Sequence, residues 1–492
     1  MCRAQHTKSR QLSRVIALFL VIVGITRVAE ASDWRDSLSF TLSERIRGEF
    51  VDWFQPSVAT SARRAHRYDF FASQLRLGAR LTFPHFQFMV ELQDTRLVNL
   101  PRHASLAPPI GNLGPGANYF VHTRTTSHGE TFLKQAYLTF RHSGFAMTVG
   151  RFEYSDGVET IPADSTLGWL KRARLGERLI GPFGYTHVTR SFDGTRLAYD
   201  QPHWNVTAFA FHPTAGGFEV SANRELDRIS LTGISLTVKQ LTNALPTDLR
   251  VFYLYYEDRR RDPLKVDNRP RPVRLSDKEP IAIHTWGGHA ITAIGLGPGT
   301  FDALVWTAFQ AGEWGKLNHL AWAYAVECGY QLPRLPWAPW VRLGYNRSSG
   351  DDDNTDSEHA TFFQMLPTAR IYAQFPFYNL MNSEDLFVQL IVKPHDRVTV
   401  RSDYHWLRVT ERRDLWYAGG GATSNTVFGF SGIAAGNRRE LAHLVDLGIT
   451  IKLHDRLTAY VYYGHAFGQG VARNTFSGSD ANYGYVDVTF RY

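Results

Sequence analysis

Residues 74–83 read Gln-Leu-Arg-Leu-Gly-Ala-Arg-Leu-Thr-Phe, so their side chains alternate between two faces. Leucine, alanine and phenylalanine occupy one face, whereas glutamine, arginine, glycine and threonine occupy the other. An alternation with a period of two predicts a β-strand with one apolar and one polar face. A tilted strand of about 9–11 residues is also long enough to cross a bilayer. The stretch therefore predicts either a membrane-spanning strand or a strand of a soluble sandwich.

The same alternation recurs before and after this stretch. It covers residues 37–50, 86–93 and 319–330, and it returns in the last ten positions, residues 483–492. A final strand that alternates and stops at an aromatic residue resembles the assembly signal of bacterial outer-membrane barrels. No segment after the N-terminal leader has the roughly 18 consecutive apolar residues of a transmembrane helix. The membrane barrel is therefore favoured over the sandwich.

Composition agrees with a barrel. Aromatic residues make up 13% of the chain, with 32 Phe, 22 Tyr and 12 Trp, and interfacial girdles of a barrel require such residues. The two cysteines, Cys2 and Cys328, exclude a disulfide framework and a Cys-rich zinc site. The formal net charge of the whole chain is +8.

The first thirty-one residues form a predicted secretory signal peptide. Basic residues precede an apolar core at residues 15–25, and Ala29-Glu30-Ala31 is an A-x-A cleavage signature. We expect cleavage after Ala31, so the domains are residues 1–31 as signal peptide and residues 32–492 as one barrel. At roughly 25 residues per strand with its share of loop, the mature length predicts about 16 to 20 strands, and we expect 18.

The predicted fold is therefore an all-β, transmembrane antiparallel β-barrel with long outer loops and short periplasmic turns. The expected long loops are residues 101–131, 258–280, 348–382, 411–439 and 466–482. The loop at 258–280 carries a basic run, which is either a solvated loop or a contact for lipopolysaccharide.

The polar faces of the predicted strands carry charges of both signs. The positive set is Arg45, Arg47, Arg76, Arg80, Arg342 and Arg401, and the negative set is Glu49, Glu91, Asp403, Glu440 and Asp446. Guanidinium groups that line a water-filled pore attract carboxylates and select anions. The alternative is that these residues form ion-pair ladders that only stiffen the wall. For the whole set we favour an anion-selective channel.

Other chemistry has weaker support in the sequence. Asp351, Asp353 and Asp356 form a weak calcium candidate, although no EF-hand loop is present. No histidine spacing predicts a metal site, and no cofactor or nucleic-acid partner is expected. An outer-membrane enzyme remains an alternative, but the chain lacks the G-x-S-x-G pattern, and we do not expect an enzyme.

Several short segments resemble the alginate export family of outer-membrane barrels. They are residues 45–49, 134–138, 149–153, 190–194, 349–368 and 403–417, in that order along the chain. The resemblance implies an 18-stranded barrel that exports an anionic uronate polysaccharide, such as alginate, through an arginine-rich constriction. It also implies a periplasmic scaffold partner with helical repeats and a loop that plugs the pore at rest. Residues 348–382 are the candidate for that loop, or they form an ordinary outer loop.

The resemblance extends the predicted lumen set. It adds Lys134, Arg151, Arg190, Asp193 and Arg408. The alternation fits poorly at Arg408 and at the Arg151 and Arg190 pair, where a bulge must be assumed. A porin that takes up small carboxylates would have the same architecture, so uptake remains the alternative to export. Both readings place the protein in the bacterial outer membrane, in contact with its lipid and lipopolysaccharide.

Overall fold

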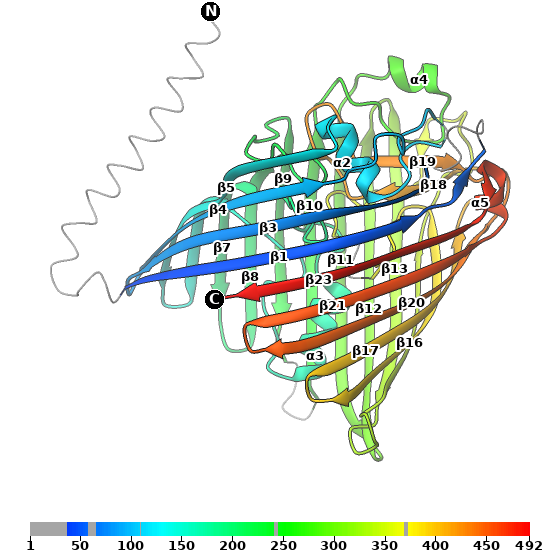
Figure 1. Ribbon diagram of the computed structural model, residues 1–492. Coiled ribbons are helices and arrows are strands. Elements are labelled where there is room, and N and C mark those ends of the chain that lie inside the picture. The colour runs from blue at the N-terminus through cyan, green and yellow to red at the C-terminus, as the bar shows by residue number, and fades with distance from the viewer. Residues whose placement is uncertain (1–36, 58–64, 109, 241–244, 369–371) are drawn as a thin grey trace, which may run out of the picture.

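The computed structural model describes residues 37–57, 65–108, 110–240, 245–368 and 372–492. The predicted signal peptide, residues 1–31, lies outside the described residues. The described chain forms a closed, antiparallel barrel of 18 strands, and the predicted fold and strand number are confirmed (Figure 1).

The barrel closes where the first strand pairs with the last, β1 with β23. Its strands are β1 (Leu38–Asp52), β3 (Arg67–Thr82), β4 (Phe86–Val98), β5 (Ser127–His142), β6 (Phe145–Phe152), β7 (Phe192–Asp200), β8 (Trp204–Pro213), β9 (Ile229–Val238), β10 (Thr247–Asp258), β11 (Ile281–Leu296), β12 (Gly299–Trp314), β13 (Leu317–Gln331), β14 (Trp340–Ser348), β16 (Ser383–His395), β17 (Val398–Val409), β20 (Glu440–His454), β21 (Leu457–Gly468) and β23 (Asp480–Arg491).

The smaller elements belong to the connections. They are β2 (Gln55–Pro56), α2 (Pro115–Thr123), α3 (Ser165–Leu170), a π-helical turn (Lys171–Leu175), α4 (Arg271–Ser276), β15 (Glu358–His359), β18 (Leu415–Gly419), β19 (Phe430–Ala434), α5 (Gly470–Thr475) and β22 (Phe476–Gly478). None of the helices in the described residues is long and apolar enough to cross a membrane.

The two ends of the barrel differ in the length of their connections. Tight turns such as residues 143–144 and 297–298 join strands at one end, and long loops join most strands at the other. In bacterial barrels the short turns are periplasmic and the long loops are extracellular. β1 begins and β23 ends at the end with the short turns, so we assign that end to the periplasm (Figure 1).

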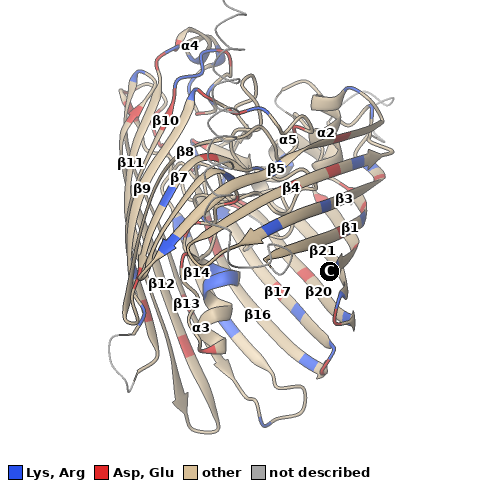
Figure 2. Cartoon of the chain, turned by 90° about the vertical axis from the view of Figure 1, so that its left-hand side faces the viewer, with Lys and Arg blue, Asp and Glu red and all other residues tan. Residues whose placement is uncertain are grey.

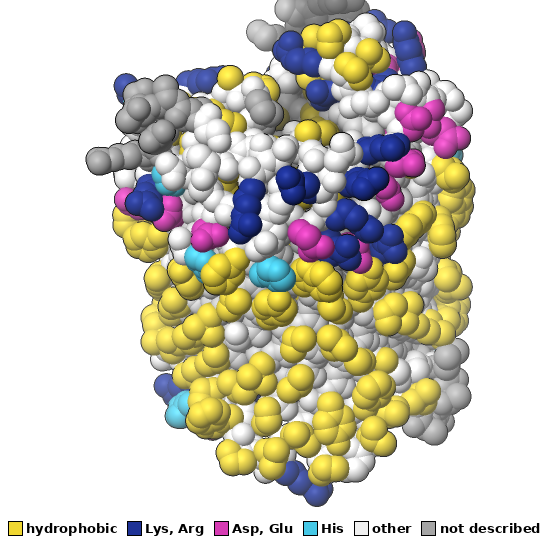
Figure 3. All heavy atoms as spheres, turned by 90° about the vertical axis from the view of Figure 1, so that its right-hand side faces the viewer, with side chains coloured by type: hydrophobic (Ala, Val, Ile, Leu, Met, Phe, Trp, Pro, Cys, Tyr) yellow, Lys and Arg dark blue, Asp and Glu magenta, His cyan; other side chains and the backbone are white. Residues whose placement is uncertain are grey.

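The outer wall is apolar, as the alternation predicts. Leu320 is 68% exposed and Phe309 is 58% exposed, which a lipid environment favours and water does not. In Figure 3, hydrophobic side chains cover a broad band of this surface, and charged side chains gather above it. The band is the part of the wall that faces lipid.

The barrel interior, or lumen, contains long segments of chain. Residues 153–191 and the described parts of 349–382 fold inward, and their apolar side chains, such as Leu179, Phe362 and Phe375, are fully buried. Segment 153–191 was not among the expected loops; we name it the first inward loop, and 349–382 the second. In Figure 2, α3 of the first inward loop lies within the barrel. The described lumen is therefore largely filled by protein, whereas the sequence had suggested a water-filled bore.

Candidate functional site

The inward face of β1 carries three of the predicted lumen residues. Arg47 donates a hydrogen bond from Nε to Oδ2 of Asp487 at 2.8 Å, across the seam that closes the barrel. Glu49 accepts hydrogen bonds from the hydroxyls of Tyr483 at 2.6 Å and Tyr185 at 3.0 Å. Arg47 and Glu49 are buried, so they hold the first inward loop against the wall.

A cavity of about 440 Å³ lies inside the barrel near the periplasmic end. This size falls within the range of about 300–1,000 Å³ that is usual for ligand pockets. Its strand residues come from β1, β3, β4 and the end of β23, and the first inward loop supplies the rest of its lining. The charged residues that line it are Arg45, Arg76, Glu91, Glu153 and Arg491.

Two arginines of the cavity wall, Arg45 and Arg76, contact the first inward loop. Arg45 donates to the carbonyl oxygens of Gly184 at 2.8 Å and Thr186 at 2.6 Å, and its nearest carboxylate, that of Asp487, is 3.9 Å away. Arg76 contacts the carboxylates of Glu153 at 3.1 Å and Glu91 at 3.8 Å. Their side chains are 15% and 18% exposed, so both remain accessible from the cavity.

Lys134 joins this group through a β-bulge. The register between β4 and β5 shifts between Glu91 and Leu92, which leaves Lys134 without a direct partner on β4. Its ammonium group contacts Glu153 at 3.0 Å and donates to the carbonyl oxygen of Arg190 at 2.7 Å. Lys134 therefore ties the wall to both ends of the first inward loop.

On the opposite wall, a buried ionic network anchors the same loop. Glu327 of β13 accepts hydrogen bonds from Arg174 at 2.8 Å, Arg178 at 3.2 Å and Arg342 at 3.0 Å, and Arg342 also contacts Asp302. All of these side chains are fully buried. Arg174 and Arg178 belong to the loop, whereas Glu327 and Arg342 belong to the wall.

Three further ion pairs hold the first inward loop to β10. Lys171 contacts Asp248 at 2.7 Å, and Arg250 contacts Asp156 at 2.6 Å and Glu159 at 2.7 Å. Of these residues and the Glu327 network, only Arg342 was among the residues predicted from the sequence. For the strand members Asp248, Arg250, Asp302 and Glu327, the polar face of the alternation was an available signal. The loop members lie outside any strand and show no such period.

The structure places the predicted lumen residues in three groups. Those that face the interior from strands are Arg45, Arg47, Glu49, Arg76, Arg80, Glu91, Lys134, Arg342, Arg401, Asp403 and Asp446. Arg190 is buried in the interior, but the first inward loop carries it rather than a strand. Arg151, Asp193, Arg408 and Glu440 lie on the outward face and form the third group.

The outward position of this third group corrects the sequence prediction. Arg151 pairs with Asp193 at 2.6 Å, and Asp193 shares its face of β7 with Leu197 and Tyr199, which are exposed. Arg408 lies over the ring of the exposed Trp406 and contacts Glu440 at 3.0 Å. These pairs lie toward the extracellular ends of their strands. Charged side chains can face outward there because this part of the wall lies beyond the apolar band, on its extracellular side.

The weak calcium candidate does not form a shared site. Asp351 accepts a hydrogen bond from the backbone N–H of Asp353, and Asp353 accepts one from the backbone N–H of Thr355. Asp356 accepts a bond from the backbone N–H of Glu358. Each carboxylate thus closes its own turn, and these three are not grouped as a cation site in the described structure.

The buried carboxyl group of Asp351 predicts a pH dependence for the stability of the second inward loop. Burial first, and then the Asp414 and Asp356 carboxylates, raise the pKa of Asp351 to about 7, against about 3.9 in an unfolded chain. A raised carboxyl pKa contributes stability at acidic pH that is lost as the pH rises through the folded value. We therefore expect hydrogen exchange in residues 349–368, corrected for intrinsic rates, to accelerate between about pH 5 and pH 8.

Asp351→Asn should remove most of this acceleration. Asp414, whose pKa burial raises to about 6, accounts for the remainder. Asp352→Asn, at an exposed neighbour, is the matched control and should keep the wild-type profile. An unchanged pH profile in Asp351→Asn would show that another group controls the loop.

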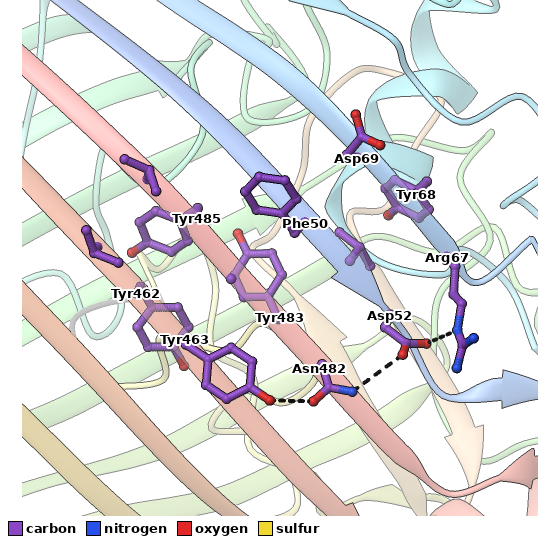
Figure 4. Close-up of a pocket in the computed structure, with 14 residues that line it drawn as sticks. Phe50, Asp52, Arg67, Tyr68, Asp69, Tyr462, Tyr463, Asn482, Tyr483 and Tyr485 are labelled. Carbon is purple, nitrogen blue, oxygen red and sulfur yellow. Dashed lines mark hydrogen bonds and ion pairs between the residues drawn. The ribbon is translucent and has the colours of Figure 1, made fainter.

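A larger hollow, of about 640 Å³, opens on the outer face where β1, β3, β21 and β23 run side by side (Figure 4). Phe50 and Tyr463 project outward on either side of Gly484, which has no side chain to fill the space between them. At its edge the Tyr463 hydroxyl donates to Asn482 at 2.7 Å. The exposed aromatic walls belong to the lipid-facing surface, so this hollow is separate from the lumen.

Comparisons with known proteins agree with this geometry. The model of the alginate export family matches residues 36–486. No curated protein matches the chain. Among solved structures, OccK9 (OpdG) of Pseudomonas aeruginosa has 10% identity and a TM-score of 0.55, with 94% of this chain and 99% of that chain covered.

Two other solved structures are similar to the same extent. OccAB4 of Acinetobacter baumannii has 8% identity and a TM-score of 0.54, with 92% of this chain and 98% of that chain covered. Pseudomonas aeruginosa OpdK, solved with vanillate, has 10% identity and a TM-score of 0.53, with the same coverage of 92% and 98%. At these identities the likeness shows the fold alone.

Proposed function

Because the chain belongs to the alginate export family and is an outer-membrane β-barrel channel, we propose that it conducts an anionic uronate polysaccharide through an arginine-rich lumen. The observation that carries this proposal is the periplasmic-end cavity with Arg45 and Arg76 in its wall. A polymer made in the cell reaches this end first. The proposal includes no catalytic step.

The chemistry of the cavity suits transient binding of carboxylates. Guanidinium groups bind carboxylates through charge-assisted hydrogen bonds, often two at a time. Arg45 is bonded mainly to neutral carbonyl oxygens, so its positive charge is not cancelled by direct contact with an acid. Glu91 and Glu153 beside Arg76 repel a bound uronate, which favours its release to the next site.

Single-channel recording of the refolded protein in a planar bilayer tests the proposal. We expect anion-selective current that short oligouronates block. Arg45→Ala combined with Arg76→Ala should weaken the block by about tenfold or more, because each lost charged hydrogen bond contributes about 1.5–3 kcal/mol. Arg408→Ala is the matched control, since it removes one arginine from the outer face.

Either of two results would contradict the proposal. The first is a non-selective current that oligouronates do not change. The second is an equal loss of block in Arg408→Ala and in the lumen variant, since this would place the effect outside the cavity.

Uptake of small carboxylates is the second candidate. The inward loops leave a cavity of about 440 Å³, which suits a small molecule better than a continuous polymer path. The structurally similar OpdK was solved with vanillate, which is a small carboxylate. Block by vanillate or a monomeric uronate, without block by oligomers, would favour uptake over export in the same recordings.

The remaining features of the proposal come from the sequence and from the family resemblance. We propose that residues 1–31 are removed as a signal peptide, that a helical-repeat scaffold binds the periplasmic end, and that residues 348–382 act as the resting plug. The basic loop at 258–280, which includes α4, would contact lipopolysaccharide. These assignments extend the channel function and do not alter its test.

A further inference from the structure

Three buried side chains in the lumen wall bring their ligand atoms together. They are Asp403 and His405 of β17 and Asp446 of β20, and one nitrogen or oxygen atom from each lies within 4.8 Å of the others. Asp403 and Asp446 are direct register partners in neighbouring strands. Alternation places His405 two positions from Asp403, on the same inward face.

Their other hydrogen bonds leave atoms available for a ligand. Nδ1 of His405 lies 2.9 Å from Oδ1 of Asp385, so an N–H at Nδ1 donates to that carboxylate and leaves a lone pair on Nε2. A metal-binding histidine commonly donates its other ring N–H to a carboxylate, which fixes the orientation of the imidazole. Asp403 accepts a hydrogen bond from Arg401 through Oδ2 at 2.7 Å, and its Oδ1 has no partner among the described residues other than the Gln389 amide.

Two further buried polar groups next to the cluster have no hydrogen-bond partner outside it in the described structure. Gln389 is the register partner of Asp403 on β16, and its amide interacts with the Asp403 carboxylate and has no other partner in the described structure. The Tyr378 hydroxyl, from the second inward loop, is unpaired as well, and it interacts electrostatically with Asp385 and Asp446. Buried polar atoms without partners are rare in folded proteins, so several around one point indicate a ligand there.

We propose that Asp403, His405 and Asp446 bind one divalent transition-metal ion, for which Zn²⁺ is the probe. Two carboxylates and one imidazole are ligands that Zn²⁺ accepts, and three protein ligands leave a position for water or the Gln389 oxygen. Charge supports this choice. The carboxylates of Asp385, Asp403 and Asp446 surround the guanidinium of Arg401 and the imidazole of His405, so a dication on that imidazole supplies the positive charge that a proton would otherwise supply.

Equilibrium dialysis of the full chain tests the site. Protein folded in detergent is stripped with EDTA, dialysed against Zn²⁺, and analysed for bound metal. We expect one tightly held ion per chain, and we expect His405→Gln to weaken its binding by about 100-fold. The double variant Asp352→Asn with Asp353→Asn, on an exposed loop, should bind as the wild type does. Faster gel migration of unheated samples confirms that each barrel is folded.

X-ray absorption at the zinc edge of the wild-type protein is the second measurement, and it does not depend on a variant. We expect one imidazole nitrogen and carboxylate oxygens around the ion. No retained Zn²⁺ would overturn the proposal and leave buried water as the partner of the unpaired atoms. Retention that is unchanged in His405→Gln, or lost in the loop double variant, would also overturn it.

Discussion

Glu327→Gln is expected to unseat the first inward loop and raise the open probability of the pore by about two orders of magnitude or more. The carboxylate of Glu327 accepts hydrogen bonds from three buried guanidinium groups, those of Arg174, Arg178 and Arg342. Removal of one charge from a buried ion pair typically costs about 3–5 kcal/mol, because the other charge remains buried without compensation.

This free-energy cost destabilises the docked position of the loop rather than the barrel itself. Glu327 and Arg342 sit in strands whose backbone hydrogen bonds are unaffected, whereas Arg174 and Arg178 belong to the first inward loop. Departure of the loop returns its two guanidinium groups to water and relieves the imbalance. The variant barrel should therefore fold and conduct more often than the wild type.

Open probability in a planar bilayer and hydrogen exchange in residues 165–182 measure this effect together. Glu440→Gln is the matched control, since Glu440 lies on the outer face and contacts Arg408. If exchange in the loop stayed at the wild-type rate in Glu327→Gln, the buried network would not be what holds the loop in the lumen.

The barrel was predictable from the sequence because its signal is local. Each strand repeats the same two-residue period, so the inward positions of Arg47, Arg76 and Asp403 follow from the apolar side chains between them. The errors at Arg151 and Arg408 came from the family resemblance, because the alternation fits an inward position poorly at both residues. Both residues lie near the extracellular ends of their strands, where the apolar band stops and the outer face carries charged side chains.

The inward loops were not predictable in the same way. Leu170, Leu179 and Ile180 are fully buried, but they follow no strand or long helix, and their partners are distant in sequence. Arg174 and Glu327 are joined only when the barrel closes around the loop. Such contacts depend on tertiary structure, so no local period in the sequence marks them.

Phe375→Ala combined with Phe377→Ala is expected to release the second inward loop. The open probability of the pore should rise strongly, as in Glu327→Gln. Both side chains are fully buried, and truncation of a buried phenylalanine typically costs about 3–5 kcal/mol. Phe375 packs against Trp53 at 5.7 Å and Tyr483 at 5.4 Å between ring centres, and Phe377 packs against Phe54 at 5.5 Å. These contacts join the loop to the wall and to the loop after β1.

Phe309→Ala is the control, because Phe309 is a lipid-facing residue and its loss leaves the lumen unchanged.

The triple variant that adds Glu327→Gln tests whether the two inward loops are coupled. The two inward loops bond to each other, from Gly181 N–H to the Leu366 carbonyl at 2.8 Å and from Leu366 N–H to the Leu179 carbonyl at 2.9 Å. Release of one loop removes these hydrogen bonds from the other loop. The effects of the two sets of substitutions on the free energy of pore opening should therefore be less than additive. Strict additivity would mean that each loop is held by the wall alone, and that the lumen has two independent plugs.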